Sequence, residues 1–122
     1  MRFLILALTF ALSTPVWADD DFRLGSTLLL SVGESKAIVK PLTCRYANEL
    51  QVKVEDQEAR IESLKVFYRD GSSKTIKVNK NIAKNERSNW LKLDRRKCIT
   101  KVQVEGYAKR KVAEIKVYGR RN

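Results

Sequence analysis

Three consecutive cations stand directly before a cysteine in the stretch Arg95-Arg96-Lys97-Cys98. Neighbouring positive charge lowers the pKa of a thiol and favours the reactive thiolate. The same cations could hold an anionic ligand through charge-assisted hydrogen bonds. A third interpretation is structural, because the chain has one other cysteine, Cys44. The stretch therefore predicts a reactive thiol, an anion-binding site or one half of a disulfide.

The residue inventory favours the disulfide. The chain has no histidine, so no Cys–His catalytic pair can form, and it has no Cys-x-x-Cys motif. In an oxidising compartment, two cysteines most often pair with each other. A Cys44–Cys98 bond would close a loop of about 55 residues, for which chain entropy predicts roughly 4 kcal/mol of stability. We expect this structural disulfide rather than a functional thiol.

The N-terminal residues predict export. Met1 and Arg2 precede an apolar run, Phe3–Leu12, which is too short for a membrane span of about 20 residues. Small residues follow, and the pattern predicts a signal peptide at 1–18 that is cleaved after Ala18. Residues 19–122 would then form a single domain, periplasmic or secreted from a bacterium, which we expect to be a monomer.

The charge of the chain suggests an anionic partner. The formal net charge is +11, and Arg2 is the one charged residue of the predicted signal peptide, so the exported domain carries +10. Solubility alone needs a magnitude of about 2–8 for a small domain. The cations that we expect to bind an anion are Arg95, Arg96, Lys97, Lys109, Arg110 and Lys111, and a third connection adds Lys80, Lys84 and Arg87. If these connections meet at one end of the fold they form a positive rim, and otherwise they solvate loops and protect strand edges.

Export narrows the choice of partner. Nucleic acid commonly binds a domain with such a charge, but an exported protein does not meet it in its physiological role. We therefore expect a binding module for an anionic lipid head group, a polysaccharide or an acidic protein. The alternative is an envelope protein–protein interaction or inhibitor protein anchored by Trp90. Alternation in Trp90–Asp94 points this ring outward, where it could equally have a structural role.

Candidate catalytic residues are sparse. Glu55, Asp56 and Glu58 are neighbouring carboxylates, and a carboxylate pair can hydrolyse glycosides. They stand in a polar turn that lacks the apolar wall needed to raise a carboxyl pKa. No ligand pattern predicts zinc or copper, and no calcium-loop pattern supports Asp19–Asp21 or Glu55–Glu58. We expect no enzyme, metal or cofactor, and a glycan hydrolase is the least favoured alternative.

Short strands must position these residues. Apolar and polar residues alternate in Glu49–Glu55 and again after Cys98. In Ser63–Val78, two alternating runs flank Asp70-Gly71, a dipeptide typical of hairpin turns. Asn79–Asn89 is interpreted as a polar connection. Seven or eight such strands, with breaks about every ten residues, predict an all-β fold, a single antiparallel β-sandwich of jelly-roll or immunoglobulin-like type with one disulfide.

Four pieces of the sequence carry a family resemblance. They are LTCRYANELQV, LKVFYRDGSSKTIKV, SNWLKLDRRKCITKVQVEG and AEIKVYG, in that order. This order resembles the YaaI family of small exported proteobacterial proteins, a domain of unknown function. Cys44, Trp90, Arg96 and Cys98 match the family pattern. The resemblance implies an exported β-sandwich with one disulfide and implies no activity, and the strong positive charge departs from the family average.

Overall fold

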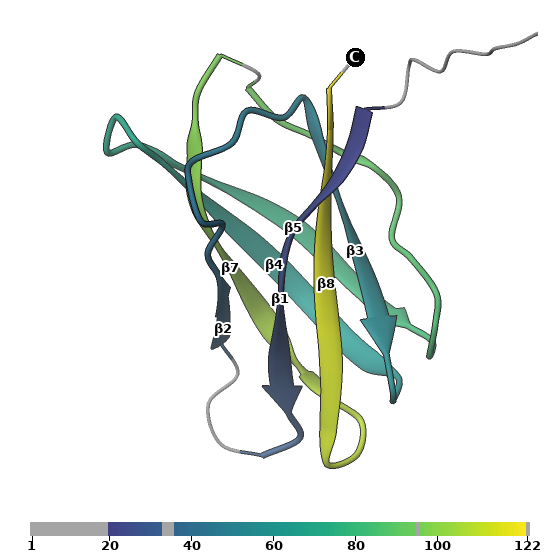
Figure 1. The fold of residues 1–122 in the computed structure, drawn as a ribbon. Coiled ribbons are helices and arrows are strands. Elements are labelled where there is room, and N and C mark those ends of the chain that lie inside the picture. Colours follow the sequence, from purple (N-terminus) through teal and green to yellow (C-terminus); the bar gives the residue numbers. More distant parts are fainter. Residues whose placement is uncertain (1–19, 33–35, 95, 122) are drawn as a thin grey trace, which may run out of the picture.

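The structure is a computed structural model that describes residues 20–32, 36–94 and 96–121. Within these ranges the chain forms eight β-strands and no helix (Figure 1). The strands are β1 (Asp20–Leu30), β2 (Lys36–Val39), β3 (Glu49–Glu55), β4 (Ala59–Tyr68), β5 (Ser73–Ile82), β6 (Leu91–Lys92), β7 (Ile99–Ala108) and β8 (Val112–Arg121). The predicted signal peptide and Arg95 lie outside the described residues. The described part contains no helix with the length and apolar character that crossing a membrane requires.

The strands form two four-stranded antiparallel sheets. Their orders are β1-β8-β3-β6 and β2-β7-β4-β5. The chain crosses between the sheets at each connection of these strands except the β4–β5 turn. The disulfide joins Cys44, which precedes β3 in one sheet, to Cys98, which precedes β7 in the other. The predicted all-β sandwich with one disulfide is therefore confirmed.

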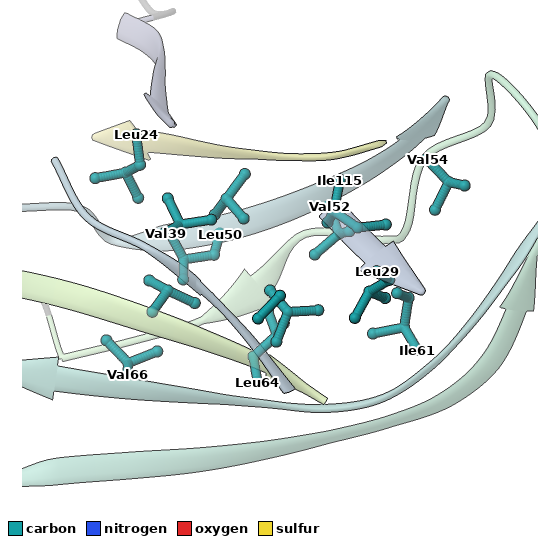
Figure 2. Packing of buried hydrophobic residues seen from close by; sticks show 14 of the residues in the cluster. Leu24, Leu29, Val39, Leu50, Val52, Val54, Ile61, Leu64, Val66 and Ile115 are labelled. Atoms are coloured by element: carbon teal, nitrogen blue, oxygen red, sulfur yellow. The ribbon is translucent and has the colours of Figure 1, made fainter. Parts of the chain in front are cut away.

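One apolar core fills the space between the two sheets (Figure 2). Leu50 and Val52 of β3 face this core, as does Ile115 of β8, and all three are fully buried. Leu64 and Val66 of β4 approach from the other sheet. Burying a side chain of this size contributes about 1.5–3 kcal/mol. A register slip of one residue would turn these side chains outward, so the core also fixes the register of the strands.

Three strands begin earlier or end later than the sequence patterns indicate. β1 begins at Asp20 because its ladder with β8 continues to the pair Asp20–Arg121. β4 begins at Ala59, before Ser63, where the alternating run of the sequence starts. The polar connection predicted from Asn79 is wrong, because β5 continues to Ile82. Alternation ends early there because a bulge interrupts the ladder of β4 and β5, and Asn79 has a positive φ of 50°.

Antiparallel strands sort the connections to the two ends of the sandwich (Figure 1). One end carries the β2–β3, β4–β5 and β6–β7 connections, residues 40–48, 69–72 and 93–98, and we call it the disulfide end. The β3–β4 and β7–β8 connections lie at the opposite end, where Ala59 of β4 pairs with Ala108 of β7. The β5–β6 connection starts at that opposite end and runs beside β3, where the backbone N–H of Ser88 donates to the Val52 carbonyl at 2.8 Å.

Candidate functional site

A pocket beside the disulfide lies between the three connections of the disulfide end. Its cavity volume is about 180 Å³. One connection contributes Tyr46, the hairpin turn contributes two residues and the third connection contributes three. The described lining residues are Tyr46, Arg69, Asp70, Arg96, Lys97 and Cys98. We call this cavity the disulfide pocket.

Covalent and backbone contacts hold the three connections together. The Cα atoms of Cys44 and Cys98 are 5.3 Å apart across the disulfide. Next to this bond, Arg45 and Ile99 exchange two backbone hydrogen bonds of 3.0 and 2.7 Å. The backbone N–H of Arg69 donates to the Cys98 carbonyl at 2.9 Å. The disulfide and these hydrogen bonds therefore fix the backbone from which the side chains of the pocket project.

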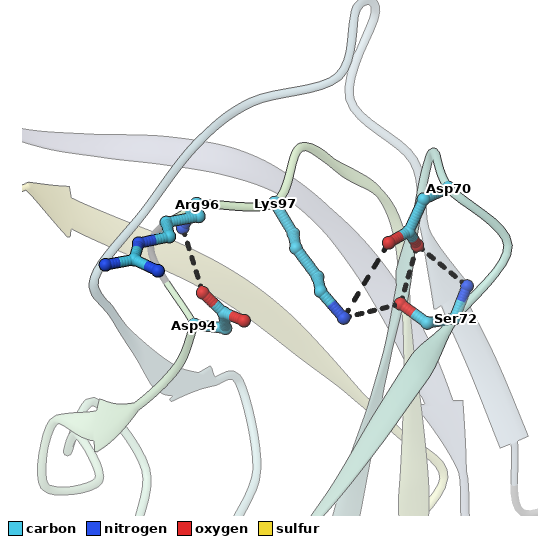
Figure 3. A network of polar contacts seen from close by, with 5 residues as sticks. All are labelled: Asp70, Ser72, Asp94, Arg96 and Lys97. Atoms are coloured by element: carbon cyan, nitrogen blue, oxygen red, sulfur yellow. Dashed lines mark hydrogen bonds and ion pairs between the residues drawn. The ribbon is translucent and has the colours of Figure 1, made fainter.

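Asp70 organises the hairpin turn and engages one cation of the pocket (Figure 3). Its Oδ1 accepts hydrogen bonds from the backbone N–H of Ser72 at 2.9 Å and from the Ser72 hydroxyl at 2.6 Å. The ammonium of Lys97 lies 3.7 Å from Asp70 Oδ2 and donates to Ser72 Oγ at 3.1 Å. The hydrogen bonds from Ser72, with the nearby Lys97 charge, lower the pKa of Asp70. Asp70 is therefore ionised at neutral pH and forms an ion pair with Lys97.

Arg69 and Arg96 carry charge that the described part of the protein does not neutralise locally. Both side chains are exposed, and neither forms an ion pair with a described residue. The backbone N–H of Arg96 donates to Asp94 Oδ1 at 3.0 Å, and Figure 3 shows its guanidinium extending away from Lys97. A guanidinium is a planar fork of N–H donors that matches carboxylate, sulfate and phosphate oxygens. Two such forks can converge on one anion.

Two tyrosines complete the surroundings of the pocket. Tyr46 is 41% exposed and offers an aromatic surface on which a flat ligand could stack. Tyr68 is only 5% exposed, and the Lys97 ammonium lies 5.5 Å from its ring centre. Burial raises the pKa of Tyr68, so its hydroxyl is neutral at physiological pH. The pocket therefore presents cationic hydrogen-bond donors beside one exposed aromatic ring.

The structure describes five of the six predicted anion-binding cations and separates them into two groups. Arg96 and Lys97 line the disulfide pocket, and Arg95 lies outside the described residues. The other three, Lys109, Arg110 and Lys111, are exposed in the β7–β8 turn at the opposite end of the sandwich. The groups are apart because one strand, β7, runs between them. From the third predicted connection, Arg87 instead stacks on Tyr118, 4.7 Å from the ring centre.

Trp90 lies on the outer face of a sheet, away from the disulfide pocket. The side chain is half-buried, and the guanidinium of Arg120 lies 4.2 Å from its ring centre. Arg120 Nε in turn donates to Glu49 Oε1 at 2.8 Å. These contacts fit the structural role that the sequence left open, and the role of a partner anchor stays a prediction.

Glu55, the last residue of β3, is paired with two lysines instead of being set up as a general acid. Glu55 is held by the ammonium groups of Lys53 at 3.0 Å and Lys116 at 3.1 Å. Hydrogen bonds from these two lysines lower the pKa of Glu55, whereas a general acid needs a raised pKa. Within the described ranges, no group of three or more His, Cys, Asp or Glu side chains is arranged to hold a metal ion.

Sequence reasoning missed Tyr46, Arg69 and Asp70 as site residues. Each lies next to a feature that the sequence did reveal. Tyr46 comes two residues after Cys44, and Arg69 and Asp70 begin the predicted hairpin turn. The signal that could have found them is the position of these two connections at the same end of the sandwich.

Comparisons of the sequence and of the fold relate the chain to known proteins. The sequence model of a family described as Domain of unknown function (DUF2541) matches residues 3–119. A search of curated proteins finds no match. Among solved structures, CpGH89CBM32-4 (seleno-methionine labelled), produced by Clostridium perfringens, is similar with a TM-score of 0.50. Its sequence is 14% identical, and the similarity covers 86% of this chain and 96% of that chain. At this identity the likeness supports the β-sandwich fold alone.

Proposed function

Because the chain belongs to the DUF2541 family, a domain of unknown function, we propose its function from its own geometry. The protein is an exported binding module without catalytic activity that recognises an anionic component of the cell envelope through the disulfide pocket. The disulfide is consistent with a periplasmic or secreted location. The narrower resemblance to YaaI proteins stays a prediction.

The observation that carries this proposal is the gathering of Arg69, Arg96 and Lys97 around one cavity. Asp70 is the single acid among the described lining residues, and it already engages Lys97. An incoming anion would therefore meet two guanidinium groups that lack an acidic partner among the described residues. Hydrogen bonds between charged groups are roughly twice as strong as neutral ones.

The neighbour in fold suggests that a carbohydrate is the first class of ligand to test. Its name contains CBM32, the designation of a carbohydrate-binding module. An acidic polysaccharide combines a carboxylate or sulfate, which suits Arg69 and Arg96, with a sugar ring, which suits the surface of Tyr46. We therefore favour an acidic polysaccharide over a lipid head group or an acidic protein as the ligand of the pocket.

The double substitution Arg69→Gln/Arg96→Gln tests the proposal. We expect the affinity for heparin, used as a sulfated polysaccharide probe, to fall roughly tenfold or more, because each hydrogen bond to a charged group contributes about 1.5–3 kcal/mol. Isothermal titration calorimetry at low and high salt measures the effect. Binding should weaken as salt rises, because exposed charges are screened within about 10 Å at 0.1 M.

The matched control removes two charges at the opposite end of the sandwich. The Lys109→Gln/Arg110→Gln protein has the same net charge as the test variant but an intact disulfide pocket. We expect its heparin affinity to stay close to that of the wild type. Equal losses in the two variants would show that the overall charge, and not the pocket, binds the polysaccharide.

Removing the acid of the pocket should have the opposite effect. In Asp70→Asn, the amide oxygen can still accept the hydrogen bonds from Ser72, while the negative charge beside Lys97 disappears. We expect heparin to bind roughly two- to fivefold more tightly at low salt, the size of effect that a single exposed charge pair produces. Unchanged or weaker binding would mean that Asp70 does not limit the positive potential of the pocket.

The pH dependence of this difference gives a second readout. The pKa of Asp70 lies below its ordinary value of 3.8, so the wild-type carboxylate is charged at neutral pH. As pH falls through that lowered pKa, the wild-type carboxyl becomes protonated and resembles the amide. The advantage of Asp70→Asn should therefore vanish at acidic pH, where heparin sulfates remain charged. A constant advantage down to pH values at which the carboxyl is protonated would contradict the electrostatic cause.

A further inference from the structure

A second open cavity lies at the same end of the sandwich and shares the 40–48 connection with the disulfide pocket. Its volume is about 370 Å³. The described residues that line it are Arg23, Leu24, Pro41, Leu42, Thr43 and Arg45. We call it the Arg45 pocket. The sequence patterns did not single out this site.

The 40–48 connection separates the two cavities. Arg45 lies in an extended segment, because its backbone pairs with Ile99 as in an antiparallel ladder. In extended chain, consecutive side chains project to opposite sides. Arg45 lines one cavity and Tyr46 lines the other. The two cavities therefore flank one extended stretch of backbone.

The Arg45 pocket is also cationic. The guanidinium of Arg45 stacks on Phe22 of β1, 4.0 Å from the ring centre, and that of Arg121 lies 5.3 Å from the same ring. Stacking fixes the plane of a guanidinium and leaves the N–H donors at its rim accessible. Arg23 is exposed, and neither Arg23 nor Arg45 forms an ion pair with a described residue. No acid is found among the described lining residues.

We infer that the disulfide end binds a linear acidic polysaccharide that crosses the 40–48 connection and places one charged unit in each pocket. This inference rests on the proposed function and adds a second subsite to it, so that the ligand is a polymer with at least two anionic units. A small anion would use one pocket only. A polymer uses both, because the second contact becomes intramolecular once the first has formed.

A membrane surface is the rival occupant. Leu42 is fully exposed, with a relative accessibility of 104%, and it stands between Lys40 and Arg45. Peripheral membrane proteins combine apolar side chains with cations in this way. Here the arginines line two cavities instead of surrounding a broad apolar surface, and a single leucine offers little area for insertion. The geometry therefore favours the polymer.

Length-defined heparin oligosaccharides test the inference. We expect the affinity of the wild-type protein to rise roughly tenfold or more from the disaccharide to the decasaccharide, because the longer chain reaches both pockets. In Arg23→Gln/Arg45→Gln this rise should be lost, while the disaccharide binds as in the wild type. Lys109→Gln/Arg110→Gln should retain the full rise. Arg23→Gln alone, at an exposed position, keeps the test valid if the double variant does not fold.

Each other outcome overturns a distinct claim. An affinity that does not increase with length, or an increase that survives in Arg23→Gln/Arg45→Gln and in Arg23→Gln, overturns the two-pocket inference. A disaccharide that binds equally to wild type and Arg69→Gln/Arg96→Gln overturns the proposed function itself. Binding to phosphatidylglycerol vesicles that is lost in Leu42→Ala, with oligosaccharide binding absent, assigns the disulfide end to a membrane and also overturns the inference.

Discussion

Replacing Cys44 and Cys98 together by alanine is expected to lower the free energy of unfolding by about 4 kcal/mol. The bond joins residues 54 positions apart, and the stabilisation follows from the chain entropy that the cross-link removes from the unfolded state. Net stabilities of small domains are about 5–15 kcal/mol, so this change removes a large share. Urea denaturation followed by circular dichroism measures it as a lower midpoint of unfolding.

The same variant should lose heparin affinity even where it remains folded. Without the disulfide, the 40–48 connection is attached to the start of β7 through the backbone hydrogen bonds between Arg45 and Ile99. The cations of the two pockets then sample more positions, and ordering them on a ligand costs free energy. The control is wild-type protein treated with reductant, which should behave as the variant does. An unchanged midpoint of unfolding in the variant would contradict the role of the bond as a structural cross-link.

The fold follows closely from the alternation of side chains. In β3, Leu50, Val52 and Val54 alternate with polar residues, and all three are fully buried. In an antiparallel sandwich one face of each strand is buried, so a period of two residues identifies the strand and its inner face together. The disulfide was predictable for a different reason, because the chain offers one pairing only.

The separation of the basic clusters could also have been predicted from the sequence. Successive antiparallel strands place successive connections at alternate ends of a sandwich. Arg96 and Lys109 stand in consecutive connections, on the two sides of the strand that follows Cys98. Counting connections puts them at opposite ends, and it puts Arg69 at the same end as Arg96. The cavities themselves were not predictable, because they depend on how Arg45 stacks on Phe22 and how Lys97 engages Asp70.

No local sequence pattern predicts the bulge in β4. The ladders of β4 with β5 and with β7 both shift between Ile61 and Ser63. A bulge bends the strand and displaces its backbone relative to the neighbour. At this place the neighbouring residue on β7 is Gly106, which pairs with Ile61. The reason for a glycine at this position is visible only in the folded structure, where the backbone of β4 approaches it closely.

Gly106→Ala is therefore expected to destabilise the protein by about 3 kcal/mol, the upper part of the usual range for overpacking. A Cβ atom built on Gly106 would clash with the carbonyl oxygen of Arg60 and lie 3.1 Å from the Cα of Ile61. These are backbone atoms within a three-strand ladder, so relieving the clash requires β4 and β7 to move apart. Urea denaturation of the purified variant measures the loss.

Gly119→Ala is the matched control, because it makes the same substitution in a strand of the other sheet. There the nearest atom to a new Cβ is Cζ of Phe22, at 2.9 Å, which belongs to a side chain. A ring can rotate away at a lower cost than a paired strand, so we expect a smaller loss of stability than in Gly106→Ala. The guanidinium of Arg45 stacks on this Phe22 ring, so Gly119→Ala should also disturb the Arg45 pocket. Gly106→Ala should instead disturb the sheet. Equal stability losses in the two variants would contradict the assignment of Gly106 to a close approach of backbones.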